Sequence, residues 1–201
     1  MDDLGVAVLS LTACVFGASA AAKLRSGKAY RSFRDELLAT RLLPLQLLAR
    51  TAVVLAGAEA LVAAGLSAAA VLITASAPGA IWVAESALAV TALLISQLAA
   101  GVAVVIRRGT RATCACFGPG AGRQLGRIHL VRNLSLLAVT CAGLASAPLT
   151  HGRPAVTGAV LGAVTGAVAA LLFIYWDDLA DLFTPSTGAA QTAGRASRRR
   201  Y

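Results

Sequence analysis

The chain has 201 residues, of which 58% are hydrophobic and 13% are charged, and its mean hydropathy is +0.75. A soluble domain typically carries about 25% charged residues, so this composition excludes an ordinary water-soluble domain and indicates an integral membrane protein. The net charge of +9 does not indicate nucleic-acid binding, because the basic residues lie between apolar segments and no nucleic-acid motif is present.

Five apolar segments are long enough to cross a bilayer, which takes about 20 mostly apolar residues. In chain order we expect spans over residues 4–22, 48–73, 81–106, 128–147 and 155–176. The first span follows Met1-Asp2-Asp3 and no basic region, so we interpret it as a retained anchor and not as a signal peptide. Between the second and third spans, Ala77-Pro78-Gly79 predicts a short turn.

The connection between the first two spans is not a plain loop. Its apolar residues fall near helical spacing, with basic and acidic residues between them, which is typical of an amphipathic helix in the membrane interface. A solvated basic loop is the alternative. The apolar residues are Tyr30, Phe33, Leu37, Leu38 and Leu42.

Basic residues predict the orientation of the spans. Residues 23–50, 107–132 and 195–200 hold 17 of the 18 lysines and arginines, and all three stretches fall on one side of a five-span arrangement. Only Arg153 falls on the other side. Because positively charged loops stay in the cytoplasm, we expect a multi-pass plasma-membrane protein with its N-terminus outside and its C-terminus in the cytoplasm.

Cys114 and Cys116 stand one residue apart between the third and fourth spans. A disulfide between them closes a small, strained ring, and strained disulfides are the ones that exchange readily. Arginines on both sides favour the reactive thiolate. Two alternatives stay open: a pair of ordinary reduced thiols, and a metal site with His129 as a third ligand, although structural zinc normally takes four ligands at a wider spacing.

Two acidic residues lie in or near apolar spans, where an ionisable group is costly and is by default functional. Glu59 is the deeper of the two, and we expect it to be protonated or paired with Arg50 or with a polar side chain such as Gln97. Glu85 is near the start of its span, so its side chain can reach the polar membrane interface, and no functional role is needed to explain a carboxyl group there.

Other residues inside the spans predict packing. We interpret Cys14 and Cys141 as packing residues, with mutual pairing or electron relay as the sharper alternative. Gly158, Gly162 and Gly166 recur every four residues and predict close helix packing, in preference to a dimer face.

The residues that open the fourth span are polar. We expect Arg132 to reach the lipid headgroups with its long side chain. Asn133 is expected to cap a backbone group or to contact the thiol loop.

Taken in order, these features resemble the MauE family of methylamine utilisation proteins, part of a wider DoxX-like group of redox-associated membrane proteins. The resemblance covers about residues 4–147. It rests on Ala22-Lys23-Leu24, Leu43-Pro44, Glu59, Gly65, Arg108-Gly109, Cys114-Ala115-Cys116-Phe117-Gly118 and Arg132-Asn133.

The expected fold is an all-α integral membrane bundle of four core transmembrane helices plus a fifth, C-terminal one, with an interfacial amphipathic helix between the first two. We expect a MauE-like domain over residues 1–147, an additional span within 148–176, and a disordered, basic, cytoplasmic tail over 177–201.

The family is implicated in the maturation of methylamine dehydrogenase. The resemblance therefore implies a membrane thiol–disulfide redox protein that acts on a disulfide-containing client protein. Carried over by motif, Cys114 and Cys116 would be the catalytic pair, and Glu59, Arg132 and Asn133 would be supporting positions of unassigned role. The family often has glycine where Ala115 stands, which restricts the turn slightly.

Charge counting places the thiols inside the cell, whereas the client that the resemblance implies, the disulfide-rich small subunit of methylamine dehydrogenase, is exported. Electron transfer across the bilayer, through Cys141 or to a quinone as acceptor, would reconcile the two, and so would the opposite orientation. The competing functions are a non-catalytic membrane assembly subunit and a small transporter that uses Glu59. The sequence does not specify the oligomeric state.

Overall fold

The computed structural model describes residues 3–110, 125–146, 156–176 and 178–179, and within these ranges it consists of helices without strands. All the helices except α2 are long and apolar enough to cross a membrane. The predicted all-α membrane bundle is confirmed, with span limits within three residues of those expected. The helices are α1 (Asp3–Leu24), α2 (Gly27–Ala39), α3 (Leu45–Thr74), α4 (Ala80–Arg107), α5 (Arg127–Ser146) and α6 (Val156–Ile174).

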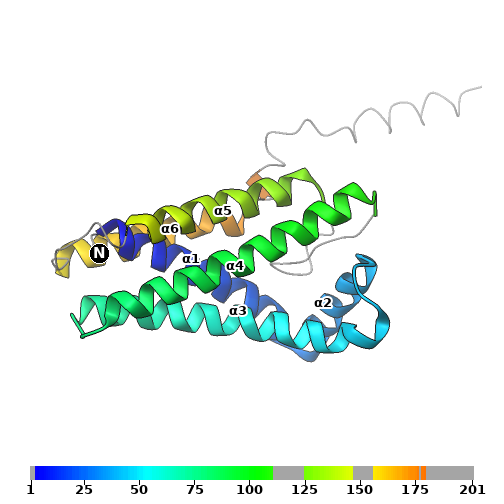
Figure 1. Cartoon of the computed structure of the whole chain (residues 1–201), viewed down its shortest axis with the longest axis horizontal. Helices are drawn as coiled ribbons and strands as arrows, with labels where there is room; N and C mark the ends of the chain where they lie inside the picture. Colours follow the sequence, from blue (N-terminus) through cyan, green and yellow to red (C-terminus); the bar gives the residue numbers. More distant parts are fainter. Residues whose placement is uncertain (1–2, 111–124, 147–155, 177, 180–201) are drawn as a thin grey trace, which may run out of the picture.

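The spanning helices run alternately up and down the bundle (Figure 1). The end of α1 and the starts of α3 and α5 lie at the same end as α2, which we call the α2 end. The N-terminus and the turn between α3 and α4 lie at the opposite end. We expect the basic connections on one side of the membrane. Those parts of them that fall within the described residues are all at the α2 end.

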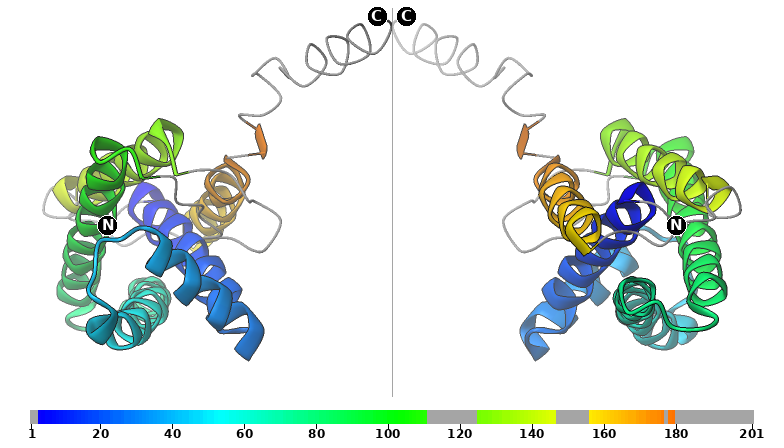
Figure 2. Two further views of the ribbon diagram at one scale, coloured as in Figure 1. Left: turned by 90° about the vertical axis from the view of Figure 1, so that its right-hand side faces the viewer. Right: turned by 90° about the vertical axis from the view of Figure 1, so that its left-hand side faces the viewer.

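Helix α1 is at the centre of the bundle, where it packs against α6, α3, α5 and α2 (Figure 2). Helix α4 completes the bundle by packing against α5 and α3. The first span is thus surrounded by protein on most sides, and a polar residue on α1 is more shielded from lipid than one on α4.

The turn between α3 and α4 forms where the sequence predicts it. Helix α3 ends at Thr74 and α4 begins at Ala80. Gly79 adopts a φ of +79°, a left-handed conformation that glycine takes without steric penalty. The short turn brings α3 and α4 side by side in antiparallel order.

Helix α2 confirms the predicted amphipathic helix. The Ser26 side chain caps its start by accepting a hydrogen bond of 3.1 Å from the backbone N–H of Ala29. None of its residues is buried, so the helix lies on the surface of the α2 end and not within the bundle.

Helices α1 and α6 are in backbone contact through the predicted glycines. Gly162 and Gly166 are buried, and a Cβ atom at Gly166 would collide with the backbone of α1 at Ala7. Ser10 of α1 donates a hydrogen bond of 2.8 Å to the carbonyl oxygen of Ala163. Close packing through small residues, as expected, is confirmed.

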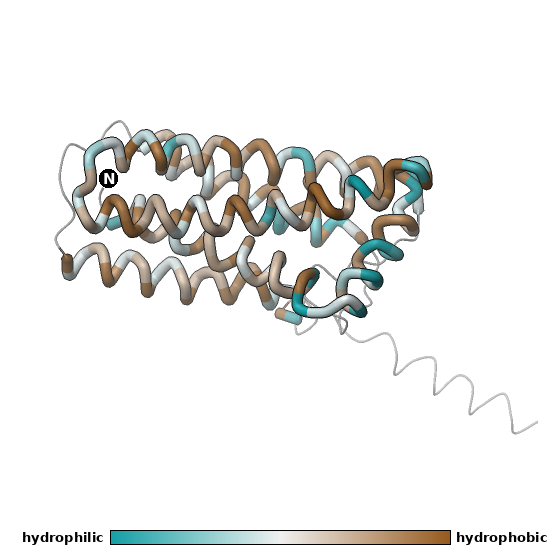
Figure 3. The backbone as a smooth tube through the Cα atoms, turned by 90° about the horizontal axis from the view of Figure 1, so that it is seen from below, coloured by the Kyte–Doolittle hydropathy of each residue, from teal (hydrophilic) through white to brown (hydrophobic). Residues whose placement is uncertain are grey.

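Residues along the spans are mostly hydrophobic, and hydrophilic residues gather mainly at the α2 end (Figure 3). Leu61, Trp82 and Val156 are each 75% exposed or more. A soluble protein rarely presents apolar surface on this scale, whereas lipid tails cover it without penalty.

Cys14 and Cys141 belong to this outer surface, where both are exposed and both are free thiols. Our interpretation of them as packing residues is therefore wrong. A cysteine is compatible with either face of an apolar helix, so its position in a span does not tell which face it occupies.

Candidate functional site

A buried ion pair joins α1 to α3 near the α2 end. Lys23 Nζ lies 2.5 Å from Glu59 Oε2, and each side chain is 3% exposed. Ser19 Oγ donates to the same carboxylate oxygen at 3.0 Å and accepts from Lys23 Nζ at 2.7 Å. The two charges compensate each other, as buried ionisable groups require in a dry interior.

The local structure explains how these groups meet. Ser19 and Lys23 are four residues apart in α1, so their side chains share one face of the helix. Lys23 is in the last turn of α1, where the helix dipole favours a cation. Its ammonium also lies 5.1 Å from the centroid of the Phe33 ring on α2, within range of a cation–π interaction.

The ion-pair partner of Glu59 is neither Arg50 nor Gln97. A polar side chain, that of Ser19, does contact the carboxylate, as one alternative expected. Arg50 is exposed and Gln97 lines the neighbouring cavity, while Lys23 makes the ion pair. Charge counting assigned Lys23 to a basic connection, yet it belongs to the first span. The available signal was the Ser19-to-Lys23 spacing, which continues the helical face of α1.

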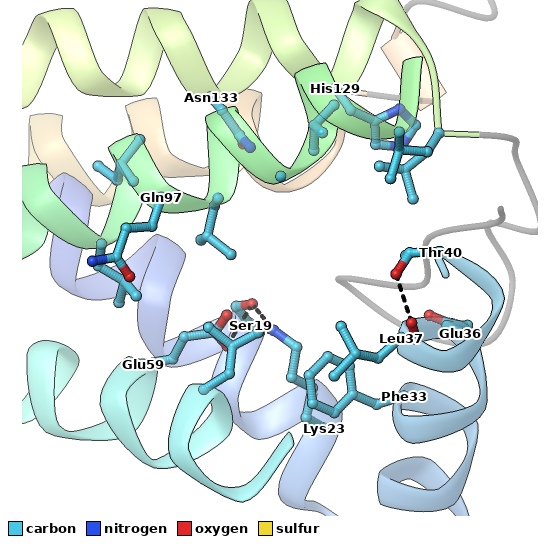
Figure 4. Close-up of a pocket in the computed structure, with 18 of the residues that line it drawn as sticks. Ser19, Lys23, Phe33, Glu36, Leu37, Thr40, Glu59, Gln97, His129 and Asn133 are labelled. Carbon is cyan, nitrogen blue, oxygen red and sulfur yellow. Dashed lines mark hydrogen bonds and ion pairs between the residues drawn. The ribbon is translucent and has the colours of Figure 1, made fainter. Parts of the chain in front are cut away.

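Helix α5 supplies the facing side of the site. Arg132 is 7% exposed and His129 is 2% exposed, so both side chains are buried on this side of the site. The expectation that Arg132 reaches the headgroups is wrong, because its face of α5 is turned into the bundle. Asn133 projects from α5 toward the space opposite Ser19, Lys23 and Glu59 (Figure 4).

These polar side chains border a cavity of about 320 Å³ at the α2 end. This volume is in the range of small-molecule binding sites, which are mostly apolar with a few polar groups that orient the ligand. Aliphatic side chains and the rings of Phe16, Phe33 and Phe173 form the apolar part of the wall. The polar and charged lining residues are Ser19, Lys23, Glu36, Thr40, Thr51, Glu59, Gln97, His129, Arg132 and Asn133.

Of the predicted site residues, the structure brings together Glu59, Arg132 and Asn133, because all three line this cavity. Cys114 and Cys116 lie outside the described residues. The first described residue after them is Leu125, which lines the cavity.

No group of three or more metal-ligating side chains occurs among the described residues. The metal site considered for Cys114, Cys116 and His129 has two of its ligands outside them. His129 Nδ1 accepts a long hydrogen bond of 3.4 Å from the backbone N–H of Gly126 at the start of α5. In the described structure His129 is a residue of the cavity wall.

A family model described as methylamine utilisation protein MauE matches residues 1–147. This chain belongs to the MauE family. The match confirms the resemblance inferred from the motifs and runs from α1 through α5, so α6 follows it. The comparisons with curated proteins and with solved structures found no match.

Membership in the MauE family associates the protein with methylamine utilisation, and the five long apolar helices make it a multi-pass membrane protein. In this MauE protein the ion pair joins two motif positions of the resemblance, Lys23 of Ala22-Lys23-Leu24 and Glu59. The structure thus connects residues that the motif pattern presents separately.

Proposed function

We propose that this MauE protein is a membrane thiol–disulfide redox protein in which Cys114 and Cys116 exchange a disulfide with a client protein. The supporting observation is the position of the cavity and its buried Lys23–Glu59 ion pair. Both lie at the α2 end, where α4 ends before the cysteine-containing segment and α5 begins after it. Leu125, the first described residue after that segment, contributes to the cavity wall.

The exchange begins when a client thiolate attacks one sulfur of the Cys114–Cys116 disulfide. A bond forms between client and protein sulfur, and the bond between the two protein sulfurs breaks. A second client thiolate then displaces the protein sulfur, which leaves an oxidised client and two reduced thiols. The client loses two electrons and two protons, so renewed oxidation of the cysteine pair needs a two-electron acceptor.

We further propose that the α2 end faces the cytoplasm. The lysines and arginines of the basic connections support this orientation, because such residues are retained on the cytoplasmic side. With this orientation the direct exchange takes place on the cytoplasmic side, before the client is exported. The orientation is independent of the exchange chemistry and is tested separately.

Thiol trapping tests the exchange. The single variants Cys114→Ser and Cys116→Ser each leave one thiol, and at least one of them should accumulate a mixed disulfide with the client. Cells that carry Cys114→Ser/Cys116→Ser should insert the protein normally and fail to mature the client.

The chain offers a matched control in Cys14→Ser/Cys141→Ser, which removes two thiols that lie on the outer surface and do not line the cavity. We expect this variant to support maturation. The exchange proposal is wrong if Cys114→Ser/Cys116→Ser matures the client as well as the control does, and a non-catalytic assembly subunit would give that result.

One observation favours a second candidate, a small transporter. Glu59 and Lys23 are ionisable groups inside spans and beside a cavity, which is a common arrangement along substrate or proton pathways. Glu59→Gln separates the two functions. If this variant loses substrate flux but keeps thiol exchange, the result supports transport. If the variant loses client maturation and the unaltered protein itself shows no flux, the result supports the redox role.

A further inference from the structure

We propose that the cavity at the α2 end binds the head group of a lipid-soluble quinone. This proposal rests on the thiol exchange for the source of the electrons, but the binding itself depends only on the cavity. A quinone takes up two electrons and two protons to become a quinol. Two thiols that close a disulfide release the same number of each, so the reaction balances without a further reactant.

The size and lining of the cavity fit the ring of such a molecule. Its volume of about 320 Å³ holds one substituted six-membered ring, and most of its wall is aliphatic or aromatic. Phe33 of α2 and Phe173 of α6 are among the lining residues. Flat, weakly polar rings bind well in sites of this composition because burial removes apolar surface from water.

Polar groups occur on two facing sides of the cavity (Figure 4). Ser19, Lys23 and Glu59 form one side on α1 and α3, and Asn133 projects from α5 on the other side. Gln97 of α4 also lines the cavity. The Ser19 hydroxyl already donates its proton to Glu59. The donors left for a ligand are therefore the Lys23 ammonium on one side and the Asn133 carboxamide on the other. Donors on two sides suit a ligand with an acceptor at each end.

A quinone ring carries its two carbonyl oxygens at opposite ends, which matches this distribution of donors. A fatty acid or a phospholipid has polar atoms at one end and a hydrocarbon chain at the other. Such a lipid would pair with the groups on one side and leave polar groups on the other side against hydrocarbon, which is unfavourable. The two-sided arrangement therefore favours a quinone over an ordinary membrane lipid.

Lys23 has a defined part in this arrangement. Its ammonium, held by Glu59 and Ser19, is positioned to donate a hydrogen bond to one carbonyl oxygen and to stabilise the negative charge that develops there during reduction. Lys23 would thus act on the ligand in addition to holding α1 and α3 together.

Binding of decyl-ubiquinone to the purified full-length chain in phospholipid nanodiscs tests the proposal. The excess phospholipid of the nanodisc competes for the cavity in every measurement. We expect saturable binding with one site per chain, and equal affinity for the Cys114→Ser/Cys116→Ser variant, because the thiols are not needed to hold the ring.

Two cavity variants should weaken binding. Gly101→Leu places a side chain into the cavity, since Gly101 lines it and a Cβ there would make only ordinary contact, at 3.7 Å, with Leu42. The matched control is Gly65→Leu in α3, where a Cβ would have no neighbour within 4 Å and which does not line the cavity. Asn133→Leu keeps a side chain of similar size but removes its hydrogen-bond donor. It should weaken binding about 3- to 10-fold, the effect of one hydrogen bond.

The results separate this inference from the proposed function. Absence of saturable binding, or unchanged affinity in both Gly101→Leu and Asn133→Leu, would overturn the quinone site even if a mixed disulfide with the client is trapped. Quinone binding that weakens in these two variants would support the site even if no thiol exchange is ever detected.

Discussion

Lys23 of α1 and Glu59 of α3 form an ion pair of 2.5 Å in which both side chains are 3% exposed. The pair connects the first spanning helix with the next one at the wall of the cavity. It is therefore both a structural link and the most polar part of the candidate site, and these two roles are separable by experiment.

Removal of one partner should destabilise the protein. Lys23→Met leaves the Glu59 carboxylate buried without its cation, and breaking a buried pair in this way costs about 3–5 kcal/mol. We expect the free energy of unfolding in detergent to fall by that amount, measured by denaturant titration with helix content as the signal.

Two further variants control this measurement. Lys28→Met removes an exposed lysine of α2 and should change stability by no more than about 0.5 kcal/mol. The double variant Lys23→Met/Glu59→Leu should recover most of the loss, since replacement of a whole buried pair by apolar residues is often neutral. If Lys23→Met is as stable as the unaltered protein, the ion pair makes no net contribution to the free energy of unfolding.

Close packing of α6 on α1 should be sensitive to a larger residue at Gly166. A Cβ at this position would collide with the α1 backbone at Ala7, so Gly166→Leu must push the helices apart. Overpacking of this kind costs about 1–3 kcal/mol or more, which should appear as a lower unfolding temperature in detergent.

Gly65→Leu is the matched substitution, because a Cβ at Gly65 meets no neighbour within 4 Å. It should leave the unfolding temperature close to that of the unaltered protein. Equal effects at Gly166 and Gly65 would mean that loss of helical glycine, and not contact with α1, determines the result.

The cap of α2 should control the local stability of that helix. Ser26→Ala removes the side-chain oxygen that accepts from Ala29 N–H, and loss of an N-cap costs about 1 kcal/mol. Amide hydrogen exchange in the first turn of α2 should accelerate about fivefold, while exchange in the spanning helices stays the same.

Ser32→Ala is the control, since Ser32 lies within α2 and its hydroxyl makes only an exposed contact of 3.4 Å with Glu36. Exchange in the first turn should be unaffected by this change. Unaltered exchange in Ser26→Ala would argue that packing on the bundle, and not the cap, holds the start of α2.

The proposed orientation predicts which end of the bundle is accessible from outside the cell. In a variant with all four native cysteines replaced by serine, Ala75→Cys marks the α3–α4 turn and Ser26→Cys marks the α2 end; both positions are exposed. A membrane-impermeant maleimide should label Ala75→Cys in intact cells and Ser26→Cys only after lysis. The reverse pattern would place the α2 end outside.

Several features of the fold follow from local sequence alone. Apolar length determined the five spans, because a bilayer crossing requires an uninterrupted hydrophobic helix. Helical spacing of apolar residues identified α2, and Pro78-Gly79 identified the turn before α4. The regular spacing of Gly162 and Gly166 predicted close packing, although it did not say that α1 is the partner.

The site was only partly predictable. Glu59 stood out because a carboxyl group is rare in an apolar span, and Arg132 and Asn133 stood out through their motif. The sequence did not identify Lys23 as the partner of Glu59, because a lysine near the end of a span is equally compatible with a position in the loop and a position in the helix. Cys14 and Cys141 were placed on the wrong face, because cysteine is compatible with both protein and lipid surroundings.

Hydrophobicity and spacing along the chain determined which segments are helices and where they begin and end, because those properties depend on neighbouring residues. The tertiary structure decided that Lys23 meets Glu59, that Arg132 faces inward, and that both border one cavity. These relationships depend on how each helix is rotated against its neighbours. That rotation is set by side-chain packing between segments far apart in the chain, which no local pattern encodes.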